Sequence, residues 1–134
     1  MRLVTLCLSV TTLLGCAAPP PRGEADWVIK EYNLPITCTG QDECARLWRA
    51  AQVWVADNAG YKIQTSSDAV IETFGGAEPY GSRWAMQVTR VPIDRNVDRI
   101  VLRPRCGQVS LCRPSAMEMV ARFHAALRLT QTLK

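Results

Sequence analysis

Two pairs of cysteines impose the strongest constraint on how this chain can fold. Cys38 and Cys44 are separated by five residues, and so are Cys106 and Cys112. Each pair stands just before a segment whose apolar residues recur with helical periodicity. A disulfide within each pair closes a small loop that fixes how the following helix begins. The pairing Cys38–Cys44 and Cys106–Cys112 is therefore favoured among the three connectivities that four cysteines allow.

The first residues of the chain are typical of an export signal. Arg2 supplies a positive charge, and Leu3 to Leu14 form an apolar run of twelve residues. That length suits a signal peptide and is short of the roughly 18 residues that a membrane-spanning helix needs. The run ends in Leu13-Leu14-Gly15-Cys16, which resembles the lipobox of bacterial lipoproteins.

The lipobox resemblance implies a modification site and a membrane. In that family a lipid is attached to the cysteine through a thioether, and cleavage before it leaves Cys16 as the new N-terminus. Leu14 departs from the small or β-branched residue that is more usual there. Each buried methylene of an acyl chain contributes roughly 0.8 kcal/mol, and two or three chains anchor stably. Ala17 in place of aspartate favours the outer membrane by the same resemblance. The alternatives are a secretory signal with an incidental cysteine, or a buried N-terminal helix.

These features divide the chain into three parts. Residues 1–15 are expected to be the signal peptide, and residues 16–26 the lipidated cysteine with a proline-rich tether. Residues 27–134 then form one disulfide-stapled domain. The formal charge of +4 is a weak and scattered excess. Such an excess is typical of a solvated surface, so no nucleic-acid partner is expected.

The six cysteines have separate expected fates. Cys7 leaves with the signal peptide and Cys16 takes the lipid, which leaves the two spaced pairs. An even set in an exported domain indicates two disulfides. A four-cysteine zinc site is the alternative, but zinc ligand pairs usually lie roughly two to four residues apart. No metal and no cofactor are therefore expected.

Two helices are predicted from hydrophobic periodicity. The first covers residues 42–58, capped by Thr39 or Gly40 and ended by a left-handed Gly60. The second covers residues 114–129, with Pro114 in its first turn. The apolar face of the first holds Cys44, Leu47, Trp48, Ala51, Trp54 and Val55, and that of the second holds Ala116, Met119, Val120, Phe123, Ala126 and Leu127.

Four short strands are predicted between these helices, over residues 61–65, 69–74, 83–91 and 97–103. Short connections favour antiparallel neighbours. The predicted fold is an α+β two-layer sandwich: a four-stranded antiparallel meander flanked by an N-terminal and a C-terminal helix on one face. This order is similar to the helix-grip domains of an accessory lipoprotein of the outer-membrane β-barrel assembly machinery, in topology and location alone. The opposite face of the sheet is expected to carry Lys62, Gln64, Val70, Glu72, Phe74, Gln87, Thr89, Val101 and Arg103.

The residues offer little that points to catalysis. The only histidine, His124, falls at the border of an apolar helix face. No G-x-S-x-G, S-x-x-K or H-E-x-x-H motif is present, and Glu72 and Glu78 are the only acidic pair near a loop. The chain is therefore expected not to be an enzyme. Trp27, just after the tether, is expected to cover a sheet edge or contact a partner.

Together these observations predict a lipid-anchored lipoprotein of the outer membrane, facing the periplasm. Its expected activity is non-catalytic binding of an envelope protein or a cell-wall polymer. One alternative is an inhibitor of a lytic enzyme, with the loop at residues 75–81 inserted into a cleft. Another is a small hydrolase that uses His124.

Overall fold

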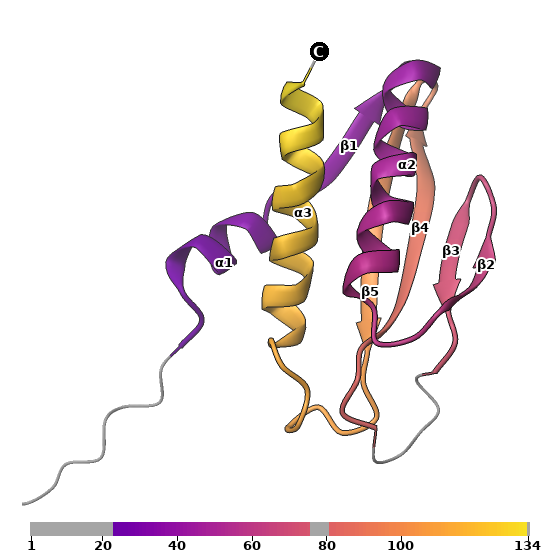
Figure 1. Ribbon diagram of the computed structural model, residues 1–134. Helices are drawn as coiled ribbons and strands as arrows, with labels where there is room; N and C mark the ends of the chain where they lie inside the picture. The colour runs from indigo at the N-terminus through magenta and orange to yellow at the C-terminus, as the bar shows by residue number, and fades with distance from the viewer. Residues whose placement is uncertain (1–22, 76–80, 134) are drawn as a thin grey trace, which may run out of the picture.

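The computed structural model describes residues 23–75 and 81–133 (Figure 1). The expectations for the signal peptide, for Cys16 and the first part of the tether, and for Glu78 and its loop lie outside these residues. The elements in chain order are α1 (Asp26–Tyr32), β1 (Ile36–Thr39), α2 (Gly40–Asn58), β2 (Ile63–Ser66), β3 (Val70–Thr73), β4 (Ala85–Asp94), β5 (Val97–Arg105) and α3 (Ala116–Thr132).

The strands form one antiparallel sheet in the order β1-β5-β4-β3-β2. Strands β2 to β5 are the predicted meander. The prediction of four strands was one short, because β1 pairs with β5 at the far edge, with Ile36 opposite Ile100. β1 has four residues and runs directly into α2, so its sequence read as the lead-in to the helix rather than as a strand.

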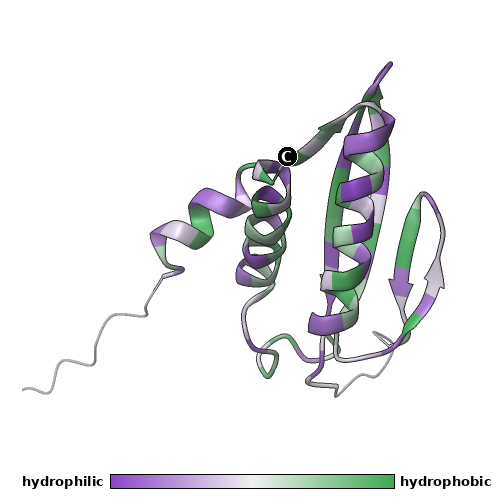
Figure 2. Ribbon diagram, turned by 45° about the horizontal axis from the view of Figure 1, so that its top comes forward, coloured by the Kyte–Doolittle hydropathy of each residue, from purple (hydrophilic) through white to green (hydrophobic). Residues whose placement is uncertain are grey.

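Helices α2 and α3 lie side by side on one face of the sheet, which confirms the predicted two-layer α+β sandwich (Figure 1). Apolar and polar residues alternate as bands along both helices (Figure 2). Their apolar faces and the inward residues of the strands form the core. Its largest fully buried side chains include Phe123, Ile36, Leu47, Ile71, Met86, Ile100 and Leu127.

The ends of α2 differ from the prediction. The helix begins at Gly40, and the Thr39 side chain makes no capping bond. Instead the Glu43 carboxylate accepts a hydrogen bond from the Thr39 N–H at 2.8 Å. The prediction that Gly60 ends the helix in a left-handed conformation was wrong, since the C-cap is Ala59 in an extended conformation. Gly60 serves a close approach, because a Cβ there would lie 2.6 Å from Cβ of Arg83.

Helix α3 begins two residues later than predicted, at Ala116. Ser115 is its N-cap, and the Ser115 hydroxyl accepts a hydrogen bond from the Glu118 N–H at 3.1 Å. Pro114 therefore precedes the helix. Its carbonyl accepts a hydrogen bond from Nε1 of Trp84 at 3.1 Å, which ties the start of α3 to the start of β4.

Helix α1 was not predicted. It packs against α3 through Val28, which is buried, and through Glu31, whose carboxylate pairs with Arg128 at 2.8 Å. Trp27 projects from this helix and is 45% exposed, so it belongs to the surface of α1 and not to the core. None of the helices in the described ranges is long and apolar enough to cross a membrane.

Candidate functional site

The four cysteines of the domain form two disulfides, Cys38–Cys44 and Cys106–Cys112, in the connectivity that the spacing favoured. The first joins β1 to the N-terminal part of α2, and the second closes the loop between β5 and α3. The Asp98 carboxylate lies close to the first pair, with its oxygen and the two sulfurs within 4.8 Å of one another. A metal ion needs thiolates, however, and these sulfurs are bonded to each other.

His124 lies in the contact between α1 and α3 and is 7% exposed. Its Nδ1 is 2.8 Å from the Glu31 carbonyl oxygen, so Nδ1 carries the proton and donates it. Burial is the largest influence on this imidazole and lowers its pKa below 6.5. The hydrogen bond to the α1 backbone indicates that the ring fixes α1 on α3.

The helix-free face of the sheet carries the polar residues that the alternation predicted. Glu72 lies at its centre, half-buried, and its carboxylate accepts hydrogen bonds from Arg105 at 2.8 Å and from Gln87 at 3.5 Å. The neighbouring Thr89 hydroxyl is buried without a hydrogen-bond partner among the described residues. With its charge compensated by Arg105, Glu72 contributes to a cross-strand network on this face.

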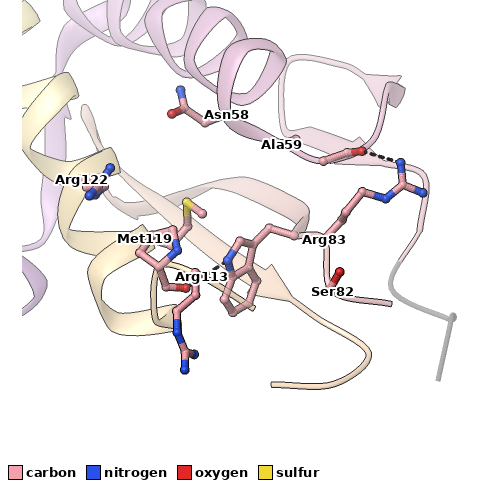
Figure 3. A pocket seen from close by; sticks show the side chains of 10 residues that line it. Asn58, Ala59, Ser82, Arg83, Arg113, Met119 and Arg122 are labelled. Atoms are coloured by element: carbon pink, nitrogen blue, oxygen red, sulfur yellow. Dashed lines mark hydrogen bonds between the residues drawn. The ribbon is translucent and has the colours of Figure 1, made fainter. Parts of the chain in front are cut away.

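A hollow of about 290 Å³ lies between the end of α2 and the starts of β4 and α3 (Figure 3). The guanidinium of Arg83 turns away from Met119 towards the backbone beside Ala59 (Figure 3), where it donates to the Gly60 carbonyl at 3.3 Å. The two other arginines that line the hollow are also engaged. Arg113 donates to the Cys112 carbonyl at 3.0 Å, and Arg122 pairs with Glu118 at 2.6 Å. Of these three arginines only Arg122 has an ion-pair partner, and the other two donate to backbone carbonyls.

The largest hollow described here, of about 790 Å³, runs along the outer edge of β5. We call it the β5 edge groove. Its walls come from three parts of the chain: the end of α1 with the segment that follows it, strand β5, and the first half of α3. The residues that line it are Tyr32, Asn33, Pro35, Arg99, Ile100, Val101, Leu102, Arg103, Pro104, Ala116, Met117, Val120 and His124.

The groove exists because β1 covers only part of β5. The last pair between these strands joins Ile36 to Ile100, and the chain before Ile36 leads back through Pro35 into α1. Tyr32 and Asn33, at the end of α1, close one end of the groove. In the described structure, residues 101–105 of β5 have a strand partner only on the β4 side. We call this stretch the free edge.

Alternation along β5 decides which backbone groups face the groove. The Gly40 N–H donates to the Asn96 carbonyl at 2.8 Å, which marks a hydrogen-bonded pair. In an antiparallel ladder such pairs recur at every second residue, so Ile100 directs its N–H and C=O towards β1. The same alternation directs the N–H and C=O of Leu102, and the C=O of Pro104, outward from the free edge.

The groove carries an uncompensated positive charge. Arg99 and Arg103 line it and are exposed, and neither has an ion-pair partner in the described part of the chain. The lining contains no aspartate or glutamate. By contrast, four other arginines do form ion pairs within the domain: Arg90, Arg105, Arg122 and Arg128.

Comparison with protein-family models, with curated proteins and with solved structures finds no match. What defines the class of this protein is therefore its own architecture: a small α+β sandwich with two local disulfides and a groove beside the part of β5 that β1 leaves unpaired. The sequence did not predict that the residues of the β5 edge groove lie together. One signal was available, since Pro104 lies inside a strand and proline within sheets is confined to edges and bulges.

Proposed function

We propose that this chain is a lipid-anchored lipoprotein of the bacterial cell envelope, and that its domain binds another envelope component through the β5 edge groove without catalysing a reaction. The observation that carries the proposal is the groove itself, where a hollow of about 790 Å³ meets a strand edge and two arginines that have no partner among the described residues. We place the protein at the outer membrane, facing the periplasm.

The cysteines support the envelope location. Two disulfides that join nearby residues staple the domain, and such bonds persist in oxidising compartments such as the periplasm. The resemblance of Leu13-Leu14-Gly15-Cys16 to a lipobox supports the anchor. The proline-rich segment that follows Cys16 suits a tether, because consecutive prolines form an extended spacer.

The shape and chemistry of the groove support binding. Specific ligand sites are concave and largely apolar, with a small number of placed polar groups. The groove combines apolar side chains of α3 with outward backbone groups of β5 and the guanidinium groups of Arg99 and Arg103. An unpaired strand edge is also a template for another chain, and natural proteins usually cover or blunt it.

Site-specific crosslinking in cells tests this proposal. A photoactivatable amino acid replaces Val101 in the groove, and in a control it replaces Thr65 on β2, the strand at the opposite edge. We expect one dominant adduct from position 101, and we expect mass spectrometry to identify it as an envelope protein or a cell-wall polymer. We expect none from position 65 and a weaker adduct in a Cys16→Ser background. Equal yields from both positions would contradict binding at the groove.

The non-catalytic part of the proposal has a separate test. Turnover of a substrate by the purified protein, abolished by a point mutation that leaves the fold intact, would overturn it. His124→Gln is the first variant to examine in such a case, because the sequence contains no other histidine.

A further inference from the structure

We propose that the occupant of the β5 edge groove is an extended protein segment in which apolar and acidic side chains alternate, and that it pairs with β5 as a sixth strand. This inference rests on the proposed binding function and specifies the chemistry of the partner. Three properties of the groove lead to it: its backbone groups, the difference between its two walls, and its charge.

The backbone groups select an extended peptide. Leu102 presents both an N–H and a C=O at the free edge, and Pro104 presents a C=O. An incoming strand can satisfy all three, as strands do when they add to a sheet edge. Pro104 has no N–H to donate, so the pairing is centred on Leu102. The free edge has five residues, which corresponds to about 17 Å of strand.

The two walls select an alternating sequence. On the helix side, α3 presents Ala116, Met117 and Val120. On the helix-free side, the exposed side chains of β5 are those of Arg99 and Arg103. Successive side chains of a strand point to opposite faces of the sheet. A strand laid along the free edge therefore directs every second side chain towards the apolar surface of α3. The others point to the helix-free face, where Arg103 lies on the free edge and Arg99 lies just before it, opposite Thr37 of β1.

The charge selects carboxylates for the second set. Arg99 and Arg103 are four residues apart on β5, so both project to the same face, with Val101 between them. Neither has an ion-pair partner among the described residues. Guanidinium groups bind carboxylates with two parallel hydrogen bonds, and these charge-assisted bonds are stronger than neutral ones. Aspartate or glutamate at alternate positions of the partner would supply both the charge and the geometry.

A peptide-binding experiment tests the inference on the full-length chain in detergent. The probe is a fluorescein-labelled peptide of alternating valine and glutamate, about seven residues long, which is the length of an ordinary strand. Fluorescence anisotropy measures its binding. A peptide of the same composition with the valines grouped together is the pattern control. A third peptide, N-methylated at the backbone nitrogens that would face β5, is the pairing control.

We expect the alternating peptide to bind and both control peptides to bind at least about tenfold more weakly, since each loses one element of recognition. Arg103→Glu should weaken binding of the alternating peptide by about tenfold or more, because it replaces attraction by repulsion. The matched variant Arg95→Glu, in the turn between β4 and β5, should change it less than about twofold. Circular dichroism verifies that both variants are folded.

Each outcome decides a different claim. Absence of binding by the alternating peptide, or equal binding of the N-methylated peptide, overturns strand addition. Equal binding of the grouped peptide overturns the alternating pattern. The crosslinking experiment separates these failures from failure of the binding function. A dominant partner at position 101 whose crosslinked segment lacks acidic and apolar alternation would leave the binding function standing and refute this inference.

Discussion

His124 illustrates how the protonation state of one residue depends on its packing. Its ring lies between α1 and α3, and its Nδ1 donates to the Glu31 carbonyl. Burial lowers its pKa most strongly, and the positive charge of Arg128 lowers it further. The hydrogen bond to the Glu31 carbonyl and the charge of the Glu31 carboxylate oppose that shift but do not reverse it. The folded protein therefore holds the imidazole in its neutral form at neutral pH.

The lowered pKa predicts a pH dependence of stability. The unfolded chain protonates His124 near 6.5, whereas the folded chain does so only at lower pH. Above about pH 6.5, neutral His124 should contribute its full stabilisation to the folded protein. As the pH falls from about 6.5 towards the lower pKa of the folded state, that stabilisation should be lost and the free energy of unfolding should decrease. Urea titrations at about pH 7.5 and about pH 5 measure it. In His124→Gln the decrease should be smaller, and an identical decrease in both proteins would contradict the prediction.

Trp48 predicts the energetic value of one buried polar contact. Its indole is 5% exposed, and its Nε1 donates to the Ser67 carbonyl at 2.9 Å, which joins α2 to the turn between β2 and β3. Trp48→Phe removes that donor and some apolar contact, so we expect a loss of about 1–3 kcal/mol in the free energy of unfolding. The matched variant Trp27→Phe, at a side chain that is 45% exposed, should change stability by less than about 0.5 kcal/mol. Similar losses in both variants would contradict this assignment.

Among the elements, α3 depends on its N-terminal cap. The Ser115 hydroxyl accepts a hydrogen bond from the Glu118 N–H, one of the donors that the helix itself leaves unsatisfied. Ser115→Ala should lower the free energy of unfolding by about 1 kcal/mol. Ser110→Ala, at an exposed position in the preceding loop, is the control and should have little effect. Thermal or urea unfolding measures both, and equal stability of the two variants would rule out the cap as a stabilising contact.

The elements also differ in how far the sequence predicts them. α2, α3 and the four-stranded meander have long or regular apolar patterns, and each was predicted close to its position. α1 has seven residues and buries only Val28, and helices this short are marginal without tertiary contacts. Its Glu31 contacts Arg128, which is 97 residues away in sequence. Local periodicity cannot report such a contact, so α1 was missed.

The β5 edge groove was missed for a related reason. Its walls come from α1, β5 and α3, and it forms only because β1 ends at Ile36. A pattern within one segment gives no information on where a neighbouring strand stops. The sequence did predict correctly that Val101 and Arg103 lie on the helix-free face, because alternation along β5 is a local property.

At the scale of the whole molecule, the two disulfides should differ in how readily they are reduced. Cys38, Cys44 and Cys112 are all buried, whereas Cys106 is half-buried next to an exposed loop and is the sulfur most open to a reductant. A limiting amount of reductant should therefore open Cys106–Cys112 first. Alkylation followed by mass spectrometry identifies the freed thiols, and earlier labelling of Cys38 would contradict the prediction.

Each small disulfide-closed loop should contribute about 2 kcal/mol to the free energy of unfolding.

Pro104 also affects how copies of this protein behave when they are crowded together. The free edge offers two hydrogen-bond acceptors, the C=O groups of Leu102 and Pro104, but only one donor, the Leu102 N–H. When two copies meet through these edges with Leu102 opposite Leu102, antiparallel register places the Pro104 carbonyl of each copy opposite Ile100 of the other, whose groups are already bonded to β1. The ladder then ends after a single pair. In this register the free edge of β5 therefore favours a short foreign strand over a second copy of itself.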